Sequence, residues 1–374
     1  MPDFRADHVG SLLRPPELLE AHRAFEQGQL TAEALAQVED QAIDAAFDLQ
    51  KQAGLPIFSD GEYRRSTWAG DFADAVDGYI SGEPPVVLHW RGITGVPRGE
   101  APTTTGGRII GERLRQARRL TAHESAYLKD HAPGPYKVTM PSPSYVVARG
   151  YKPGVTDKVY NSRAELLGQV SAILQAEARA LVEEGVRYIQ IDNPHYPDYI
   201  DPLRRQQWTD MGVDPDTALD EDIVADNAVL TGFDRSGVIL AMHICRGNGG
   251  QAGWHTEGSY EQIAERVFGS VNVDRWLLEY DSDRAGGFEP LRFMPKGKTV
   301  VLGLVTTKAG ALENQDDILK RIDEASRYVA AEDLALSPQC GFASVMAGNP
   351  LSPEEQRRKL ALVVDTATKV WGSV

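Results

Sequence analysis

The stretch SRAELLGQVSAILQAEARALVEEGVRYIQIDNP, residues 162–194, contains the pattern that decides the fold. Its first part, 162–184, predicts an amphipathic helix that ends at Gly185, and the apolar run at 188–191 predicts a short strand. An apolar strand that follows a helix is typical of a buried parallel sheet whose faces are covered by helices. The stretch therefore predicts a helix–strand unit, and the strand ends in a carboxylate, Asp192.

The same alternation of a short apolar run and a longer amphipathic stretch recurs along the chain. Further strands are predicted in the run before His8 and at 55–58, 136–140, 238–242, 276–278, 300–304 and 334–336. Further helices are predicted at about 16–27, 31–53, 260–268 and 353–371. Ser259 and Ser352 are the expected caps of the last two helices, and Gly269 is the expected end of the helix at 260–268. Eight successive strands, each followed by helix or loop, favour an α/β fold with a closed (β/α)8 barrel over an open doubly wound sheet.

One long segment interrupts this rhythm. Residues 66–135 separate the second and third predicted strands and contain GRIIGERLRQARRL at 107–120. The chain has 374 residues, which exceeds the roughly 250 residues of a minimal barrel. Neither a linker-like composition nor an internal repeat divides the sequence. We therefore expect a single (β/α)8 catalytic domain over 1–374, in which 66–135 is an insertion and serves as a lid.

Composition and charge exclude several classes of function. Hydrophobic residues make up 42% of the chain and charged residues 25%, as in ordinary folded proteins. The 39 Lys and Arg residues against 54 Asp and Glu residues leave a net charge of −15, which opposes binding to nucleic acid. The two cysteines are too few for a disulfide scaffold, and no apolar run has the length of a signal peptide or a membrane span. We expect a cytoplasmic protein with no nucleic-acid or membrane partner, and a homo-oligomer remains open.

Chemically useful residues follow the predicted strands. Active sites of (β/α)8 barrels are built at the carboxyl ends of the strands, so these residues are the candidates for a site. In chain order they are His8 with Gly10 and Ser11, Asp60 with Glu62, Ser142, Asp192, His243 with Cys245, Glu279, Thr306 with Thr307, and Cys340.

Four of these residues form a candidate metal site. His243 and Cys245 are two residues apart, so on an extended strand end their side chains point to the same face. Cys340 follows the last predicted strand and Glu279 ends another, which brings two sulfurs, one nitrogen and one oxygen toward one end of the barrel. Such a set suits Zn²⁺. On spacing alone the alternative stays open, in which the cysteines are small buried apolar residues and the histidine is a core residue.

Three carboxylates stand at other strand ends. Asp60 and Glu62 lie in SDGEYRRS, where Arg64 and Arg65 follow directly. An acid–base pair and a solvated ion-pair cluster are both compatible with that spacing. Asp192 closes an apolar strand, which is an unfavourable place for a carboxylate unless another group satisfies it. This placement favours a functional role for Asp192.

Seven segments together resemble one family. The sequence from about residue 4 to 372 is similar to the catalytic domain of cobalamin-independent methionine synthase, and especially to its short, single-barrel relatives. The segments that carry the resemblance are DHVGSLLRP (7–15), SDGEYRRS (59–66), YIQIDNP (188–194), HICRGN (243–248), LLEYDSDRAG (277–286), VLGLVTTK (301–308) and LALSPQCGFAS (334–344).

The resemblance implies a zinc-dependent S-methyltransferase that transfers a methyl group from a donor to homocysteine and so forms methionine. The zinc ligands it implies are His243, Cys245, Glu279 and Cys340. The substrate-binding residues it implies are Gly10, Ser11, Glu62 and Asp192, with Asp192 also as the catalytic residue. The carboxylates suit the ammonium group of homocysteine.

The sequence departs from the family in the part that concerns the methyl donor. Thr306 stands where the longer enzymes have a histidine that helps to protonate the leaving folate, and a threonine cannot act as a general acid near pH 7. The folate-stacking tryptophan is also missing, and Tyr145 is the nearest aromatic residue. A bulkier donor needs room near His195, Tyr196 and His255. The donor therefore stays open.

Three other functions remain compatible with the sequence. The first is alkyl transfer to another thiol, such as coenzyme M with an epoxide. The second is a barrel enzyme like uroporphyrinogen decarboxylase, which needs no metal, and the third is a non-catalytic sensor that holds zinc or a thiol metabolite. Zinc content and turnover on a thiol discriminate among them.

Overall fold

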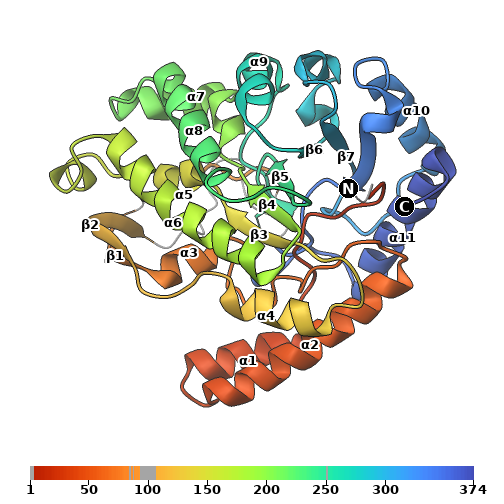
Figure 1. Ribbon diagram of the computed structural model, residues 1–374, viewed down its shortest axis with the longest axis horizontal. Coiled ribbons are helices and arrows are strands. Elements are labelled where there is room, and N and C mark those ends of the chain that lie inside the picture. The colour runs from red at the N-terminus through yellow and green to blue at the C-terminus, as the bar shows by residue number, and fades with distance from the viewer. Residues whose placement is uncertain (1–3, 84–85, 87, 93–106, 250–251) are drawn as a thin grey trace.

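Six parallel strands form the centre of the protein (Figure 1). The computed structural model describes residues 4–83, 86, 88–92, 107–249 and 252–374. In these residues the strands pair in chain order, each with the next. They are β3 (Val138–Pro141), β4 (Tyr188–Asp192), β5 (Ile239–Ile244), β6 (Arg275–Glu279), β7 (Thr299–Val305) and β8 (Leu334–Pro338). The structure thus confirms a mixed α/β fold with a parallel sheet, and the last six predicted strands are present.

The first two predicted strands are wrong as strands. The run before His8 and the run at 55–58 each make a single parallel bridge, Ala6 to Leu336 and Phe58 to Tyr136. Between the two runs a ring nitrogen of His8 lies 3.2 Å from the carbonyl oxygen of Ile57. The Ile57 carbonyl oxygen therefore contacts a side chain, whereas in a continuous β-ladder it would accept a hydrogen bond from a backbone amide.

Helices surround the strands (Figure 1). Their bounds are α1 (Pro16–Glu26), α2 (Ala32–Gln52), α5 (Pro143–Gly150), α6 (Arg163–Glu184), α7 (Pro202–Asp210), α8 (Pro215–Val229), α9 (Glu261–Ser270), α10 (Gln315–Ala325) and α11 (Pro353–Trp371). Short 3-10 helices complete the connections at η1 (Thr156–Lys158), η2 (Tyr196–Tyr199), η4 (Asp283–Ala285), η5 (Glu289–Phe293) and η6 (Ala331–Asp333). Among the described residues no helix is both long and apolar enough to cross a membrane.

Most of the predicted helix ends are confirmed. Gly185 ends α6 with a φ of 101°, and Ser352 begins α11 with a capping box that includes Glu355. The helix predicted at 260–268 instead begins at Glu261 and continues to Ser270. Gly269 does not end it, because its φ is not positive. Ser259 still accepts a hydrogen bond of 3.3 Å from the backbone amide of Glu261.

The segment 66–135 has its own small elements. It contains α3 (Gly70–Ala75), the antiparallel strands β1 (Val76–Ser81) and β2 (Arg108–Gln116), and α4 (Ala122–His131). Residues 84–85, 87 and 93–106 of this segment lie outside the described residues. The strand pair packs on α5, since a Cβ atom added to Gly150 would lie 2.6 Å from Ile110 Cδ1.

Both faces of the parallel sheet are buried. Side chains of alternate residues pack either with the surrounding helices or in a second, smaller apolar cluster. The members of the smaller cluster are Phe4, Val9, Ile57, Tyr188, Ile239, Ala241, Leu277, Val301 and Ala335. Burial on two faces explains why the strands are continuously apolar.

A buried ion cluster lies beside this inner apolar cluster. The Asp7 carboxylate is fully buried and accepts hydrogen bonds from Lys137 Nζ at 2.9 Å and from the Tyr188 hydroxyl at 2.8 Å. Arg275 Nη2 lies 3.4 Å from the same carboxylate. Burial alone would raise the pKa of Asp7, but Lys137 and Arg275 hold it well below its usual range. The N-terminal segment is thus fastened to the sheet by an ionised group.

Candidate metal centre and substrate pocket

The protein's two cysteines and one histidine meet at the carboxyl end of the sheet. His243 is the penultimate residue of β5, Cys245 follows that strand directly, and Cys340 comes two residues after β8. One potential ligand atom from each residue lies within 4.8 Å of the others, and all three residues are buried. The two sulfurs are 3.8 Å apart. The structure therefore brings three of the four predicted metal ligands together.

The His243 ring is oriented as in a metal site. Its Nδ1 atom lies 3.1 Å from the Leu277 carbonyl oxygen, and because a carbonyl only accepts, Nδ1 is the donor. The other ring nitrogen, Nε2, is buried without a hydrogen-bond partner in the part of the chain that the structure describes. A histidine that binds a metal through one nitrogen usually donates the proton on the other to a carbonyl or carboxylate. The orphaned Nε2 atom and the two sulfurs fit a zinc ion.

The two thiols share their protons unequally. The hydrogen bond with Cys245 lowers the pKa of Cys340 well below the usual range of a thiol, and His243 lowers it further. The same hydrogen bond, together with burial, raises the pKa of Cys245. These opposite directions favour the thiolate form at Cys340, and a thiolate is the form that binds a metal.

Glu279, the fourth predicted ligand, is engaged elsewhere. Its Oε1 atom accepts a hydrogen bond of 2.7 Å from Arg284 Nε, and its Oε2 atom accepts one of 2.7 Å from the backbone amide of Arg246. Burial raises the pKa of Glu279, but Arg284 and Arg246 lower it overall, so that the carboxylate is ionised. Glu279 is not part of the group whose ligand atoms lie within 4.8 Å of one another, and its role as a ligand stays a prediction.

A pocket adjoins these three residues. It is also lined by Ser11, Glu62 and Asp192, so most of the predicted substrate-binding residues reach one cavity. The rest of its lining comes from Val9, Trp68, Leu88, Trp90, Tyr145, Arg149, Pro194, Gly247, Asn248, Gly249, His255, Gly341, Ser344 and Val345. Gly10 does not line the pocket, but its φ of 141° and the Glu62 Oε1 atom, 2.9 Å from where a Cβ would be, both require a glycine there.

Glu62 is held in an unusual backbone conformation. Its φ is 60°, and its backbone amide donates a 3.0 Å hydrogen bond to the Asp60 carboxylate. Its Oε1 atom accepts a hydrogen bond of 2.9 Å from Thr139, whereas Oε2 is buried with no partner among the described residues. Burial, together with Asp60 and Glu124, raises the pKa of Glu62 to about 7. A carboxylate with a free buried oxygen is suited to an ammonium group.

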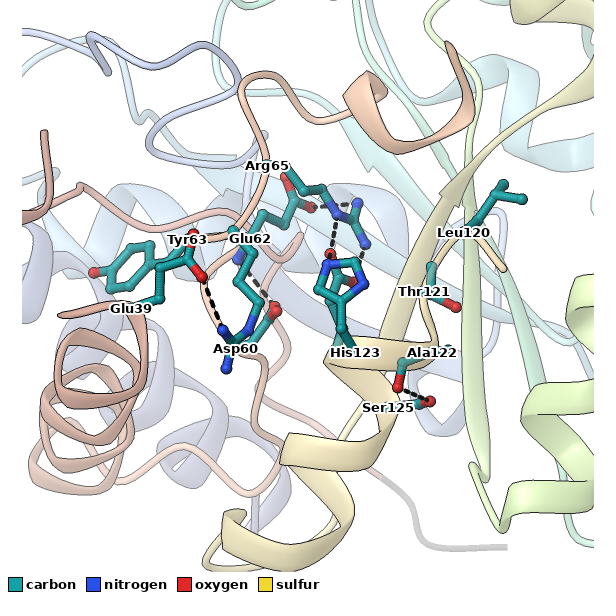
Figure 2. Close-up of polar contacts among 12 residues, drawn as sticks. Glu39, Asp60, Glu62, Tyr63, Arg65, Leu120, Thr121, Ala122, His123 and Ser125 are labelled. Carbon is teal, nitrogen blue, oxygen red and sulfur yellow. Dashed lines mark hydrogen bonds and ion pairs between the residues drawn. The ribbon is translucent and has the colours of Figure 1, made fainter. Parts of the chain in front are cut away.

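One of the two arginines of SDGEYRRS forms an ion pair with Glu62. Arg64 points to Glu39, with Nη1 at 2.9 Å from the carboxylate. Arg65 pairs most closely with Glu124. Its Nη1 atom also lies 3.8 Å from Glu62 Oε1 (Figure 2), but burial raises the pKa of Glu62 more than Arg65 lowers it. The ion-pair cluster expected from the sequence is therefore real, but it is buried and leaves one oxygen of Glu62 open.

Asp192 completes the acidic side of the pocket. Its Oδ1 atom accepts a hydrogen bond of 2.7 Å from Gln190. Burial is the main reason that its pKa rises to about 7; nearby Glu62 adds to the rise and His243 opposes it. Asp192 therefore changes its charge near neutral pH.

Several pocket residues were missed from the sequence. Trp68, Leu88 and Trp90 come from the 66–135 segment, and Arg149 comes from α5. Arg149 follows Tyr145 by one helical turn, and that spacing is the signal that could have found it. Of the residues expected near a bulky donor, His255 lines the pocket, whereas His195 and Tyr196 do not.

Comparison with known proteins places the chain among methionine synthase-like sequences. Residues 4–369 match the family model described as cobalamin-independent synthase, catalytic domain. The uncharacterized protein YxjG of Bacillus subtilis is 36% identical, and the alignment covers 99% of this chain and 95% of that protein.

Two solved structures are similar over their whole length. A structure from Listeria monocytogenes, named provisionally as a vitamin-B12-independent methionine synthase, has a TM-score of 0.76 at 29% identity and covers 100% of this chain and 99% of its own. A B12-independent methionine synthase from Shewanella, in complex with selenomethionine, has a TM-score of 0.74 at 22% identity and covers 99% and 98%. Because the Shewanella structure is only 22% identical, its similarity shows the fold alone.

Glu62→Gln tests the buried carboxyl group. The pKa of Glu62 is about 7 in the folded protein and 4.5 ordinarily, so the stabilisation from its protonated form is complete below about pH 4.5 and is lost as the pH rises through 7. We expect the free energy of unfolding of the wild type, relative to that of the variant, to fall by about 2.5 kcal/mol between pH 5 and pH 8.5. Urea titrations at both pH values measure this difference. Exposed Glu20 supplies the control, Glu20→Gln, and an equal pH dependence in all three proteins would contradict the assignment.

Proposed function

The chain belongs to the cobalamin-independent synthase catalytic-domain family, and we propose that it is a zinc-dependent S-methyltransferase that methylates homocysteine to form methionine. The observation that carries the proposal is the meeting of His243, Cys245 and Cys340 in one pocket with two carboxyl groups. The histidine and the two cysteines suit an acceptor with a thiol, and the two carboxyl groups suit an acceptor with the ammonium group of an amino acid.

In this proposal His243, Cys245 and Cys340 hold the zinc ion, and Glu279 is the fourth ligand. Zinc supplies a lowered pKa for a thiol that binds to it, so that the thiol is a nucleophile at neutral pH. Each Glu279 oxygen keeps a lone pair beside its hydrogen bond to Arg284 or to the Arg246 amide, so these contacts do not prevent Glu279 from acting as a ligand.

The acidic side of the pocket binds the amino-acid end of the substrate. Glu62 Oε2, which has no partner in the described structure, accepts a hydrogen bond from the ammonium group of the substrate. Ser11 lines the same pocket. Asp192 is the proposed catalytic residue, because a carboxyl group with a pKa of about 7 can pass the proton of the acceptor thiol on to solvent. Gly10 keeps the space that Glu62 occupies.

We also propose that the sheet closes into the (β/α)8 barrel expected from the sequence. The bridges at Ala6 and Phe58 attach the N-terminal runs to β8 and next to β3, the two edge strands of the sheet. Val9 and Ile57 share the inner apolar cluster with the strands. The lid role of 66–135 is supported by Trp68, Leu88 and Trp90, which line the pocket.

Transfer of another alkyl group, or transfer to another thiol, uses the same metal site and is decided by the acceptor test below. A decarboxylase like uroporphyrinogen decarboxylase has less support, because the two sulfurs lie together rather than apart.

Metal analysis tests the zinc site. We expect close to one zinc per chain in the purified protein, and we expect Cys245→Ser and Cys340→Ser each to lose most of it, because two thiolates dominate the ligand set. His255→Gln is the control, since His255 lines the pocket outside the metal group. Full zinc retention in both cysteine variants would end the assignment. A partial loss of zinc in Glu279→Gln would support Glu279 as the fourth ligand.

Calorimetry tests the acceptor. Homocysteine is expected to bind with release of about one proton near pH 7, because its thiol ionises on binding. Titrations in buffers of different ionisation enthalpy report the proton directly, and methionine, which has no thiol, is the control. Binding without proton release, or binding of another thiol in place of homocysteine, would refute the methionine-forming version.

Competing donors test the leaving group. The Thr306 side chain does not line the pocket, and burial lowers the pKa of His255, so neither residue supplies a proton at neutral pH. We therefore expect a methylsulfonium or methylcobalamin to give a higher kcat/KM than methyltetrahydrofolate or its polyglutamate, with homocysteine as acceptor. A clear preference for the folate would show that another residue is the general acid.

A further inference from the structure

Arg149 is a buried cation of the pocket that the proposed reaction does not use. Its side chain is only 9% exposed. Its Nε and Nη1 atoms are buried and have no hydrogen-bond partner in the described part of the chain. The Nη2 atom lies 3.8 Å from Asp198 Oδ2, which is beyond hydrogen-bond distance. A buried guanidinium with open N–H groups is unfavourable unless a ligand satisfies it.

Asp198 forms an ion pair of 3.8 Å with Arg149, but other residues bind its carboxylate more closely. Arg204 donates two hydrogen bonds to the Asp198 carboxylate, of 3.0 and 2.8 Å. His195 Nδ1 lies 2.9 Å from the same carboxylate. Arg149 is therefore the surplus positive charge of this group.

Arg149 is also held in place. Its guanidinium lies over the Tyr145 ring at 5.3 Å, and the Tyr145 ring packs on Trp68 with centroids 4.5 Å apart. A second donor stands in the same pocket, because Trp90 Nε1 is buried without a partner among the residues described. A fixed guanidinium and an indole N–H that line the same pocket are suited to an oxyanion.

The position of Arg149 separates this site from the acceptor. Trp68, Tyr145 and Arg149 line both the pocket and a second cavity that extends over α3 to Arg108. Ser11, Glu62, Asp192 and the metal group line only the first cavity. Arg149 thus stands at the junction of the two cavities, where a second substrate enters.

We infer that Arg149, assisted by Trp90, binds an anionic group of the alkyl donor, so that the donor is a small molecule with a carboxylate or sulfonate. The inference rests on the proposed function, since it assigns the acceptor to Glu62 and Asp192. The donor's reactive group then points toward the metal site and its charged end toward the junction. An uncharged or purely cationic donor lacks a partner for Arg149.

An inert pair of probes tests this inference. The pair is 3-(methylthio)propanoate and 3-(methylthio)propanamide, which have nearly the same size and differ in charge. Calorimetric titration of the zinc-loaded protein, with and without homocysteine, should show the carboxylate binding at least about tenfold more tightly than the amide. We expect Arg149→Gln to abolish that preference, Arg149→Lys to keep part of it, and Trp90→Phe to reduce it.

Arg108→Gln is the matched control, because Arg108 lines only the outer cavity and is 55% exposed on its side chain. An unchanged preference in Arg108→Gln supports the assignment, whereas an equal loss there would overturn it. Equal affinities of the wild type for the two probes would also overturn it. So would the absence of measurable binding of either probe to the wild type. If Arg149→Gln instead weakens homocysteine and spares the probe preference, Arg149 serves the acceptor and the inference is wrong. Homocysteine binding with proton release is also measured in Arg149→Gln. Loss of the probe preference while that release persists concerns the donor site alone, whereas absence of the release also in the wild type concerns the proposed function.

Discussion

The buried carboxylate of Asp7 is the contact on which the pocket depends. Asp7 is anchored by Lys137, Tyr188 and Arg275, which come from three separate places in the sheet. Lys137 also donates hydrogen bonds to Gln190 and to the His8 carbonyl, and Arg275 donates one to the Phe4 carbonyl, so the cluster ties the N-terminal run to the sheet at several points. Because Asp7 is fixed, Ser11 arrives at the carboxyl end of the sheet beside Cys340, and the N-terminal run takes its place next to β8.

Several polar atoms of the pocket are buried without a partner, as are some elsewhere in the described interior. The carboxylates of Asp7 and Asp198, by contrast, each accept several hydrogen bonds. At the pocket, His243 Nε2, Glu62 Oε2 and the Arg149 guanidinium are buried without partners in the described structure. These open groups, a ring nitrogen, a carboxylate oxygen and a guanidinium, are the places where the proposed metal, acceptor and donor would bind.

The sequence was sufficient for those features that are local or periodic. The apolar runs predicted β3 to β8 because buried parallel strands need no alternation, and the His243 and Cys245 spacing predicted a shared face that the structure confirms. The short N-terminal runs were overestimated, since a His8 side chain replaces part of the expected pairing. The ion pair of Glu279 with Arg284 depends on the conformation of the loop after β6, which no spacing rule contains, whereas the one-turn spacing from Tyr145 could have indicated Arg149.

The positions of the two sulfurs in the sequence determine when, during synthesis of the chain, both become available. Cys245 and Cys340 are 95 residues apart, and the second lies after the last strand. At a ribosomal rate of roughly 5–20 residues per second, the nascent chain exposes half of the thiol pair for about 5 to 20 s before the other half exists. The pocket also needs Ser11, from the first part of the chain, and Val345, from the last. A metal held by both sulfurs therefore requires that translation has passed Cys340, and a product truncated before Cys340 cannot hold a metal in that way.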